Sequence, residues 1–148
     1  MITTRRMFLR AAAAGAALLA LPKTLLAWPE KAFESESTDA AMKELFGSTA
    51  AAASDAVTLT APDIAENGAV VPISVSTSLE GAESIGIIVT ENPSPLVASF
   101  DLTADAVPEV STRIKMGKTS DVMAVVKANG QLYSATKNVK VTIGGCGG

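Results

Sequence analysis

The chain has 148 residues, of which 48% are hydrophobic, and its formal net charge is −3. This length suits one compact domain, and the hydrophobic content is enough to build a core. The sequence contains no histidine, one cysteine, one tryptophan and one tyrosine. The lack of histidine excludes His-based acid–base catalysis and Ser-His or Cys-His nucleophile pairs, and a single cysteine excludes an intramolecular disulfide. Cys146 is therefore the leading candidate for covalent chemistry.

The first 27 residues have the layout of an export signal. Arg5 and Arg6 precede a short apolar stretch at 11–21, and the small residue Ala27 follows as a cleavage point. The arginine pair with the following Met-Phe-Leu-Arg resembles the signal of the bacterial twin-arginine translocase, which delivers proteins to the periplasm. A membrane anchor is the alternative, but a spanning helix needs about 20 apolar residues and this stretch is roughly half that length. We expect cleavage near Trp28, and a signal that is retained remains open.

The rest of the chain is acidic. Four of the 12 basic residues lie in 1–27 and all 15 acidic residues lie beyond, which leaves eight bases against 15 acids and a net charge of −7. Nucleic acids and anionic membranes both select clustered Lys and Arg, so this balance argues against both as partners. The twin-arginine route carries folded cargo, often with a cofactor or a partner. Few residues here suit a metal or a redox cofactor, so we expect neither, and we expect a partner subunit instead.

Residues 28–55 are predicted to form an N-terminal helix and a linker. The pattern is helical over 29–46, where apolar residues can share one face, and a capped second segment begins at Thr38. Gly47 then supplies a stop signal. Residues 48–55 are small and Ala-rich, which favours a linker.

Residues 56–143 are predicted to form an antiparallel β-sandwich of immunoglobulin-like type. Seven short strands with turn residues between them are typical of that architecture. The continuous apolar run at 85–89 indicates a buried strand, and Asn129-Gly130 predicts a tight type I′ hairpin. A break in the last strand near Lys137 and Asn138 is left open. The strands are expected at 57–61, 70–77, 84–90, 96–102, 109–116, 121–127 and 131–143.

The last five residues are the candidate site. The final predicted strand leads directly into Gly144, Gly145, Cys146, Gly147 and Gly148. Glycine has wide backbone freedom, so we expect a flexible arm, with an extended reach of about 17 Å at ~3.4 Å per residue. An exposed thiol with a pKa near ~8.5 is partly ionised at neutral pH, and glycine neighbours leave its sulfur unhindered. A disordered tail with an accidental cysteine is the alternative, against which the symmetric placement of four glycines argues.

The terminal Gly-Gly-Cys-Gly-Gly, the twin-arginine signal and a β-rich body of this size resemble the SoxY family, the sulfur-carrier subunits of the bacterial thiosulfate-oxidising (Sox) system. The resemblance implies a carrier and not an enzyme. Cys146 would be the covalent attachment site, and Gly144, Gly145, Gly147 and Gly148 would form the carrier arm.

The same resemblance implies the partners. SoxZ, itself a small β-sandwich, would form a heterodimer with the chain. The haem enzyme SoxAX would load thiosulfate on the cysteine as a thiosulfonate, and SoxB would hydrolyse off sulfate. SoxCD, where present, would oxidise the remaining sulfur. The catalysts would then all lie on other proteins.

Three other functions stay open on the residues alone. A disulfide-linked immunoglobulin-like subunit would use Cys146 to lock a partner. A ubiquitin-like modifier is suggested by the terminal Gly-Gly, but export and the nearby cysteine argue against it. A cysteine-nucleophile enzyme lacks a base within the chain. Exposed edge strands and the N-terminal helix are the candidate surfaces for a partner subunit.

Overall fold

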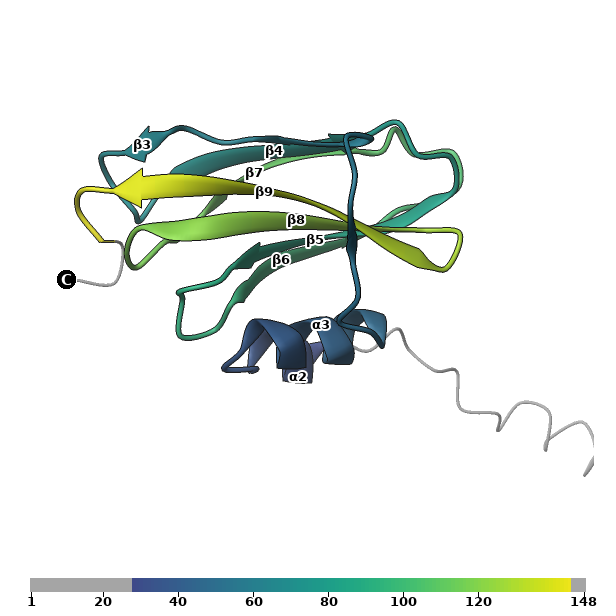
Figure 1. The fold of residues 1–148 in the computed structure, drawn as a ribbon, viewed down its shortest axis with the longest axis horizontal. Coiled ribbons are helices and arrows are strands. Elements are labelled where there is room, and N and C mark those ends of the chain that lie inside the picture. The colour runs from purple at the N-terminus through teal and green to yellow at the C-terminus, as the bar shows by residue number, and fades with distance from the viewer. Residues whose placement is uncertain (1–27, 145–148) are drawn as a thin grey trace, which may run out of the picture.

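A computed structural model describes residues 28–144, in which two β-sheets stack face to face and two short helices cover the outer face of the larger sheet (Figure 1). This confirms the immunoglobulin-like sandwich preceded by helical structure. The predicted signal at 1–27, with Arg5 and Arg6, lies outside the described residues.

The larger sheet contains the two longest strands, β8 and β9, which form a hairpin, and two very short strands, β1 and β3. Its order is β1-β9-β8-β5-β6, and β3 also pairs with β9. The strands are β1 Ala52–Ala53, β3 Ile64–Ala65, β5 Ala82–Val89, β6 Leu96–Asp101, β8 Ser120–Ala128 and β9 Gln131–Val141. The smaller sheet has the order β2-β4-β7, formed by Val57–Thr60, Val71–Thr77 and Glu109–Ile114.

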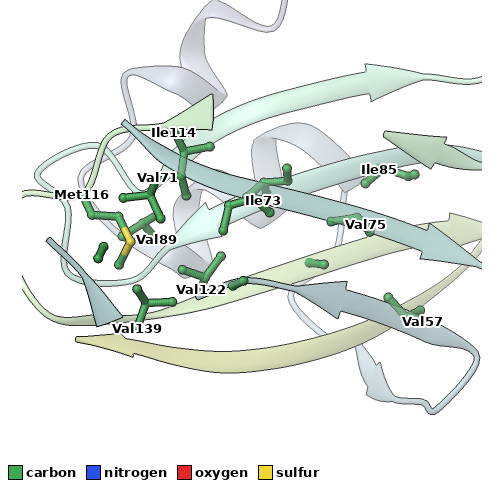
Figure 2. Packing of buried hydrophobic residues seen from close by; sticks show 14 of the residues in the cluster. Val57, Val71, Ile73, Val75, Ile85, Val89, Ile114, Met116, Val122 and Val139 are labelled. Carbon is green, nitrogen blue, oxygen red and sulfur yellow. The ribbon is translucent and has the colours of Figure 1, made fainter. Parts of the chain in front are cut away.

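The core between the sheets follows from alternation along the strands. In β4, Val71, Ile73 and Val75 point inward and are fully buried, whereas the residues between them face outward. These side chains meet inward residues of the larger sheet, such as Ile85 and Val122 (Figure 2). Burying alternate apolar residues on facing strands is what holds such a sandwich together.

The apolar run at 85–89 is buried on both faces, as predicted. Ile87 belongs to the core between the sheets, while its neighbour Ile88 packs under the helices with Val125. Successive strand residues point to opposite faces, so a strand covered on both sides needs a continuous apolar run. The helices are therefore part of the fold's second core.

The predicted helical stretch is divided into α2, Glu30–Phe33, and α3, Thr38–Phe46. The Ser37 side chain caps α3 by accepting a hydrogen bond from the backbone N–H of Ala40 at 3.2 Å. Because this cap requires an extended backbone at Ser37, the two helices cannot be continuous. Gly47, with a φ of 76°, ends α3 as predicted.

Two details differ from the sequence prediction, and one that the prediction left open is resolved. The linker contains β1, which pairs in parallel with β9, and the segment expected to be a turn contains β3, which also pairs in parallel with β9. The last strand is not broken near Lys137, because both Lys137 and Asn138 stay in register with β8. The predicted hairpin turn is confirmed by positive φ angles at Asn129 and Gly130.

Candidate functional site

The candidate site begins where β9 ends. At this end of the sandwich lie the loops 61–70, 90–95 and 115–119, the strand ends 113–114, 120–121 and 137–141 that adjoin them, and the segment 142–144; together these residues are called the arm end below. Figure 1 shows the tip of β9 and the adjoining β3 at this end. The structure thus places the final strand as predicted, leading outward from the core.

Hydrogen bonds fasten the chain on both sides as it leaves β9. On one side, the backbone N–H of Val141 donates to Thr119 Oγ1 at 3.0 Å. On the other, the Thr142 N–H donates to the carbonyl of Ala65 at 3.1 Å, and its hydroxyl donates to the carbonyl of Glu66 at 3.1 Å. The segment after the strand is therefore held between two loops.

Gly68 holds the next residue, Ile143, through a backbone hydrogen bond. Its N–H donates to the carbonyl of Ile143 at 2.7 Å, and its own carbonyl accepts from the N–H of Met116 at 2.7 Å. Gly68 thus joins the segment after β9 to the loop after β7. Backbone hydrogen bonds of this length are well formed, so Ile143 has a fixed position.

Gly144 is the last described residue, and it lies against another backbone. A Cβ placed on Gly144 would overlap the carbonyl oxygen of Gly117. Since that neighbour is backbone and not a flexible side chain, only glycine fits without moving the loop. Gly144 was predicted as part of a flexible arm. In the structure its backbone instead packs against that of Gly117, and Gly144 is called the root of the arm below.

Asn92 holds the loop against which Gly144 rests. Its Nδ2 donates to the carbonyl of Lys115 at 2.8 Å, and its Oδ1 accepts from the N–H of Gly117 at 3.0 Å. In the sequence, Asn92 falls only between two predicted strands, 84–90 and 96–102. The side chain instead bridges two loops, which local sequence patterns do not reveal.

The arm end differs from the rest of the molecule in charge. It carries five of the eight basic residues of 28–148 and four of the 15 acidic ones, whereas the remainder carries three and eleven. The basic residues are Arg113, Lys115, Lys118, Lys137 and Lys140, and the acidic ones are Asp63, Glu66, Glu91 and Asp121. The net charge is thus +1 at the arm end and −8 elsewhere.

Two of these basic residues form ion pairs with two of the acidic ones. Lys118 lies 2.9 Å from Glu91, and Lys137 lies 2.9 Å from Asp63. Within the described residues, Lys115 and Lys140 form no ion pair. Two cations beside the root of the arm therefore remain available to groups outside the chain.

Other parts of the described chain offer less. No cluster of metal-ligating side chains occurs within residues 28–144. Neither of the two helices in that range is long and apolar enough to cross a membrane. A shallow hollow of about 580 Å³, lined by residues such as Phe46, Leu132 and Tyr133, lies at the end of the sandwich opposite the arm end. It is therefore remote from the root of the arm.

The predicted attachment site continues from this root. Gly145, Cys146, Gly147 and Gly148 lie outside the described residues. What the structure adds is the position from which they start, at Gly144.

Comparison with known proteins gives a consistent result. The family model described as "Sulfur oxidation protein SoxY" matches residues 42–146, a range that includes Cys146. No curated protein sequence matches the chain. A solved structure of the sulfur carrier protein SoxY from Chlorobium limicola f thiosulfatophilum is 50% identical, with a TM-score of 0.65, over 71% of this chain and 96% of that one.

A second solved structure is similar in fold alone. It is the superoxide reductase (neelaredoxin) from Ignicoccus hospitalis, 21% identical with a TM-score of 0.50, over 57% of this chain and 79% of that one. The family match covers more than half of the chain, and the SoxY structure shares half of the aligned residues. The chain therefore belongs to the SoxY family of sulfur oxidation proteins.

Proposed function

We propose that the chain is a periplasmic sulfur carrier, exported through its twin-arginine signal, that holds thiosulfate-derived sulfur covalently on Cys146 and presents it to separate enzymes. Membership of the SoxY family is the observation that carries this proposal. It is supported by the sequence position of Cys146, two residues beyond Gly144, whose backbone packs against Gly117. The chain would thus supply a handle, with the catalytic groups on its partners.

The proposed chemistry needs only a thiol from this chain. The Cys146 thiolate and the outer sulfur of thiosulfate form a disulfide bond, and the two electrons released pass to a haem enzyme of the SoxAX type. A SoxB-like enzyme then adds water across the sulfur–sulfonate bond, which releases sulfate and leaves one sulfur atom on the cysteine. A SoxCD-like enzyme, where present, would oxidise that sulfur.

A SoxZ-like subunit is the proposed heterodimer partner. The sandwich leaves β6, β7 and β2 as edge strands in the described part of the chain, whereas β9 is covered by β1 and β3. Open edges are normally protected or paired. The β6, β7 and β2 edges are therefore better candidates for this contact than the β9 edge.

Replacing Cys146 by Ser in the source organism tests the function. Thiosulfate-dependent sulfate formation is expected to stop, while export of the chain and co-purification of its partner subunit continue. Sulfate formation at the unmodified rate would contradict the proposal. Loss of the partner subunit would instead favour a structural disulfide at Cys146.

A further inference from the structure

The spacing between Gly144 and Cys146 limits where an enzyme can act. Two fully extended residues span at most about 7 Å, so the Cα atom of Cys146 stays within that distance of the Cα atom of Gly144. Gly144 itself is seated against Gly117. If Cys146 carries the sulfur, as proposed above, any enzyme that reaches this sulfur must also come close to the arm end.

The arm end presents exposed apolar side chains at the place where this approach occurs. Ile64, Val70 and Ile143 are 56%, 53% and 66% exposed, and they make up three of the five strongly exposed large apolar residues of 28–144. We call these three residues the root collar. Isolated exposed apolar residues are ordinary, but several of them at one end of a domain are a candidate interaction surface.

Hydrogen bonds connect the elements that carry the root collar. β3, which contains Ile64, pairs with the end of β9, and Gly68 bonds to Ile143. Asn67 shapes the turn that leads to Val70, because its carbonyl accepts from the Val70 N–H at 3.3 Å. The collar residues thus have positions fixed relative to the root of the arm.

Charge around the root collar indicates what would bind there. Ile64 is the register partner of Lys140, and Lys115 precedes Met116, which bonds to Gly68. Both cations are without an ion pair in residues 28–144, whereas the 61–70 loop carries two acidic residues, Glu66 and Asp63, of which Asp63 is paired with Lys137. An apolar surface flanked by acidic groups would complement this arrangement.

We propose that the root collar is the docking surface through which an enzyme holds the carrier while Cys146 occupies its active site. The matching surface on the enzyme is an apolar rim around the mouth of the active site, with acidic groups facing Lys115 and Lys140. A carrier must leave after each reaction, which suits a small interface with a few apolar anchors. Because the tether is short, every enzyme that acts on Cys146 must come close to this surface.

Serine substitution of the collar tests the proposal. The combined variant Ile64→Ser, Val70→Ser and Ile143→Ser is compared with Val107→Ser, whose side chain is 76% exposed in the loop before β7, at the other end of the sandwich. Each is purified as the mature complex with its partner subunit. Non-enzymatic loading with tetrathionate, in which the Cys146 thiolate attacks an inner sulfur and expels thiosulfate, reports on the thiol alone.

The second measurement uses the loaded carrier and the thiosulfonate-hydrolysing enzyme. We expect kcat/KM for sulfate release to fall about tenfold or more in the collar variant and to stay unchanged in Val107→Ser, with equal tetrathionate rates in both. An unchanged kcat/KM in the collar variant would overturn the docking proposal, and so would loss of the partner subunit from that variant. If Cys146→Ser still supports sulfate release from thiosulfate, the carrier function itself is wrong.

Discussion

Gly144 and Gly117 approach each other so closely that there is no room for a side chain on Gly144. The carbonyl of Gly117 occupies the space that a Cβ on Gly144 would need. The requirement for glycine at this position is therefore steric. It differs from the reason first inferred from sequence, which was freedom of the backbone.

Gly144→Ala is expected to push the 115–119 loop away from the end of the chain. The overlap is with backbone, so relief requires a shift that costs about 1–3 kcal/mol of unfolding free energy. Hydrogen exchange at the Gly68 and Met116 amides should accelerate, since both belong to the bonds that join the loops. Hydrogen-exchange protection equal to that of the unmodified chain would show that Gly144 does not pack against Gly117.

Asn92→Ala is expected to lower the unfolding free energy by about 1–3 kcal/mol, because it removes both bonds that hold the 115–117 segment and leaves a backbone donor and acceptor without that partner. Asn138→Ala is the matched control. Its amide donates to the exposed carboxylate of Asp121 at 2.8 Å, and such a surface change is expected to stay within about 0.5 kcal/mol. Urea unfolding of both variants measures the difference, and equal losses would contradict a special role for Asn92.

At the scale of elements, α3 lies directly on β5 because Gly86 has no side chain. A Cβ on Gly86 would lie 2.9 Å from Cζ of Phe46 and 3.3 Å from a methyl carbon of Leu45. Both contacts come from the helix that covers the larger sheet. Close contact between helix and strand thus depends on this one glycine.

Gly86→Ala is expected to destabilise the fold by about 1–2 kcal/mol by displacing Phe46. In a Phe46→Leu background, which removes the crowding ring atom, the same substitution should cost less. Thermal or urea unfolding of the four proteins gives the coupling energy, and residues in contact are expected to deviate from additivity. Additive effects of the two substitutions would mean that the helix does not press on Gly86.

Sequence patterns predicted the elements that are regular and failed for those that depend on a distant partner. The seven strands and the Asn129-Gly130 turn follow from local alternation and turn chemistry. By contrast, β1 and β3 are two residues long and exist only because each pairs with β9. The Asn92 bridge was missed for the same reason, since it joins loops 25 residues apart.

At the scale of the whole molecule, the uneven distribution of charge is expected to affect the rate at which an enzyme and the carrier associate. The arm end carries a net charge of +1 and the rest of residues 28–148 carries −8. This asymmetry would orient the carrier in the field of a partner and would be screened by salt beyond about 8–10 Å.

Lys115→Glu with Lys140→Glu is expected to slow sulfate release at low ionic strength, with the loss shrinking as salt is added. Lys31→Glu with Lys43→Glu changes the net charge equally but lies on the helices, so it controls for charge alone. Measuring kcat/KM across ionic strength separates the two. Equal losses in both double variants would show that net charge matters and the position of the lysines does not.

The family and the sandwich were both predictable, because terminal residues and strand patterns carry that information in the sequence. The attachment role of Cys146 remains a prediction, as do export and the individual partners. The packing of Gly144 against Gly117 was not predictable from the sequence, since it depends on contacts among three loops.

Mass analysis of the C-terminal tryptic peptide tests directly whether Cys146 carries thiosulfate-derived sulfur. Cleavage after Lys140 releases residues 141–148, which contain the single cysteine. In protein purified without reductant from cells grown on thiosulfate, we predict an increment of two sulfur and three oxygen atoms, or of one sulfur atom, on Cys146. Reductant should remove it, and cells grown without thiosulfate should lack it. A bare thiol under both conditions, or a disulfide to another chain that thiosulfate does not change, would contradict the carrier function.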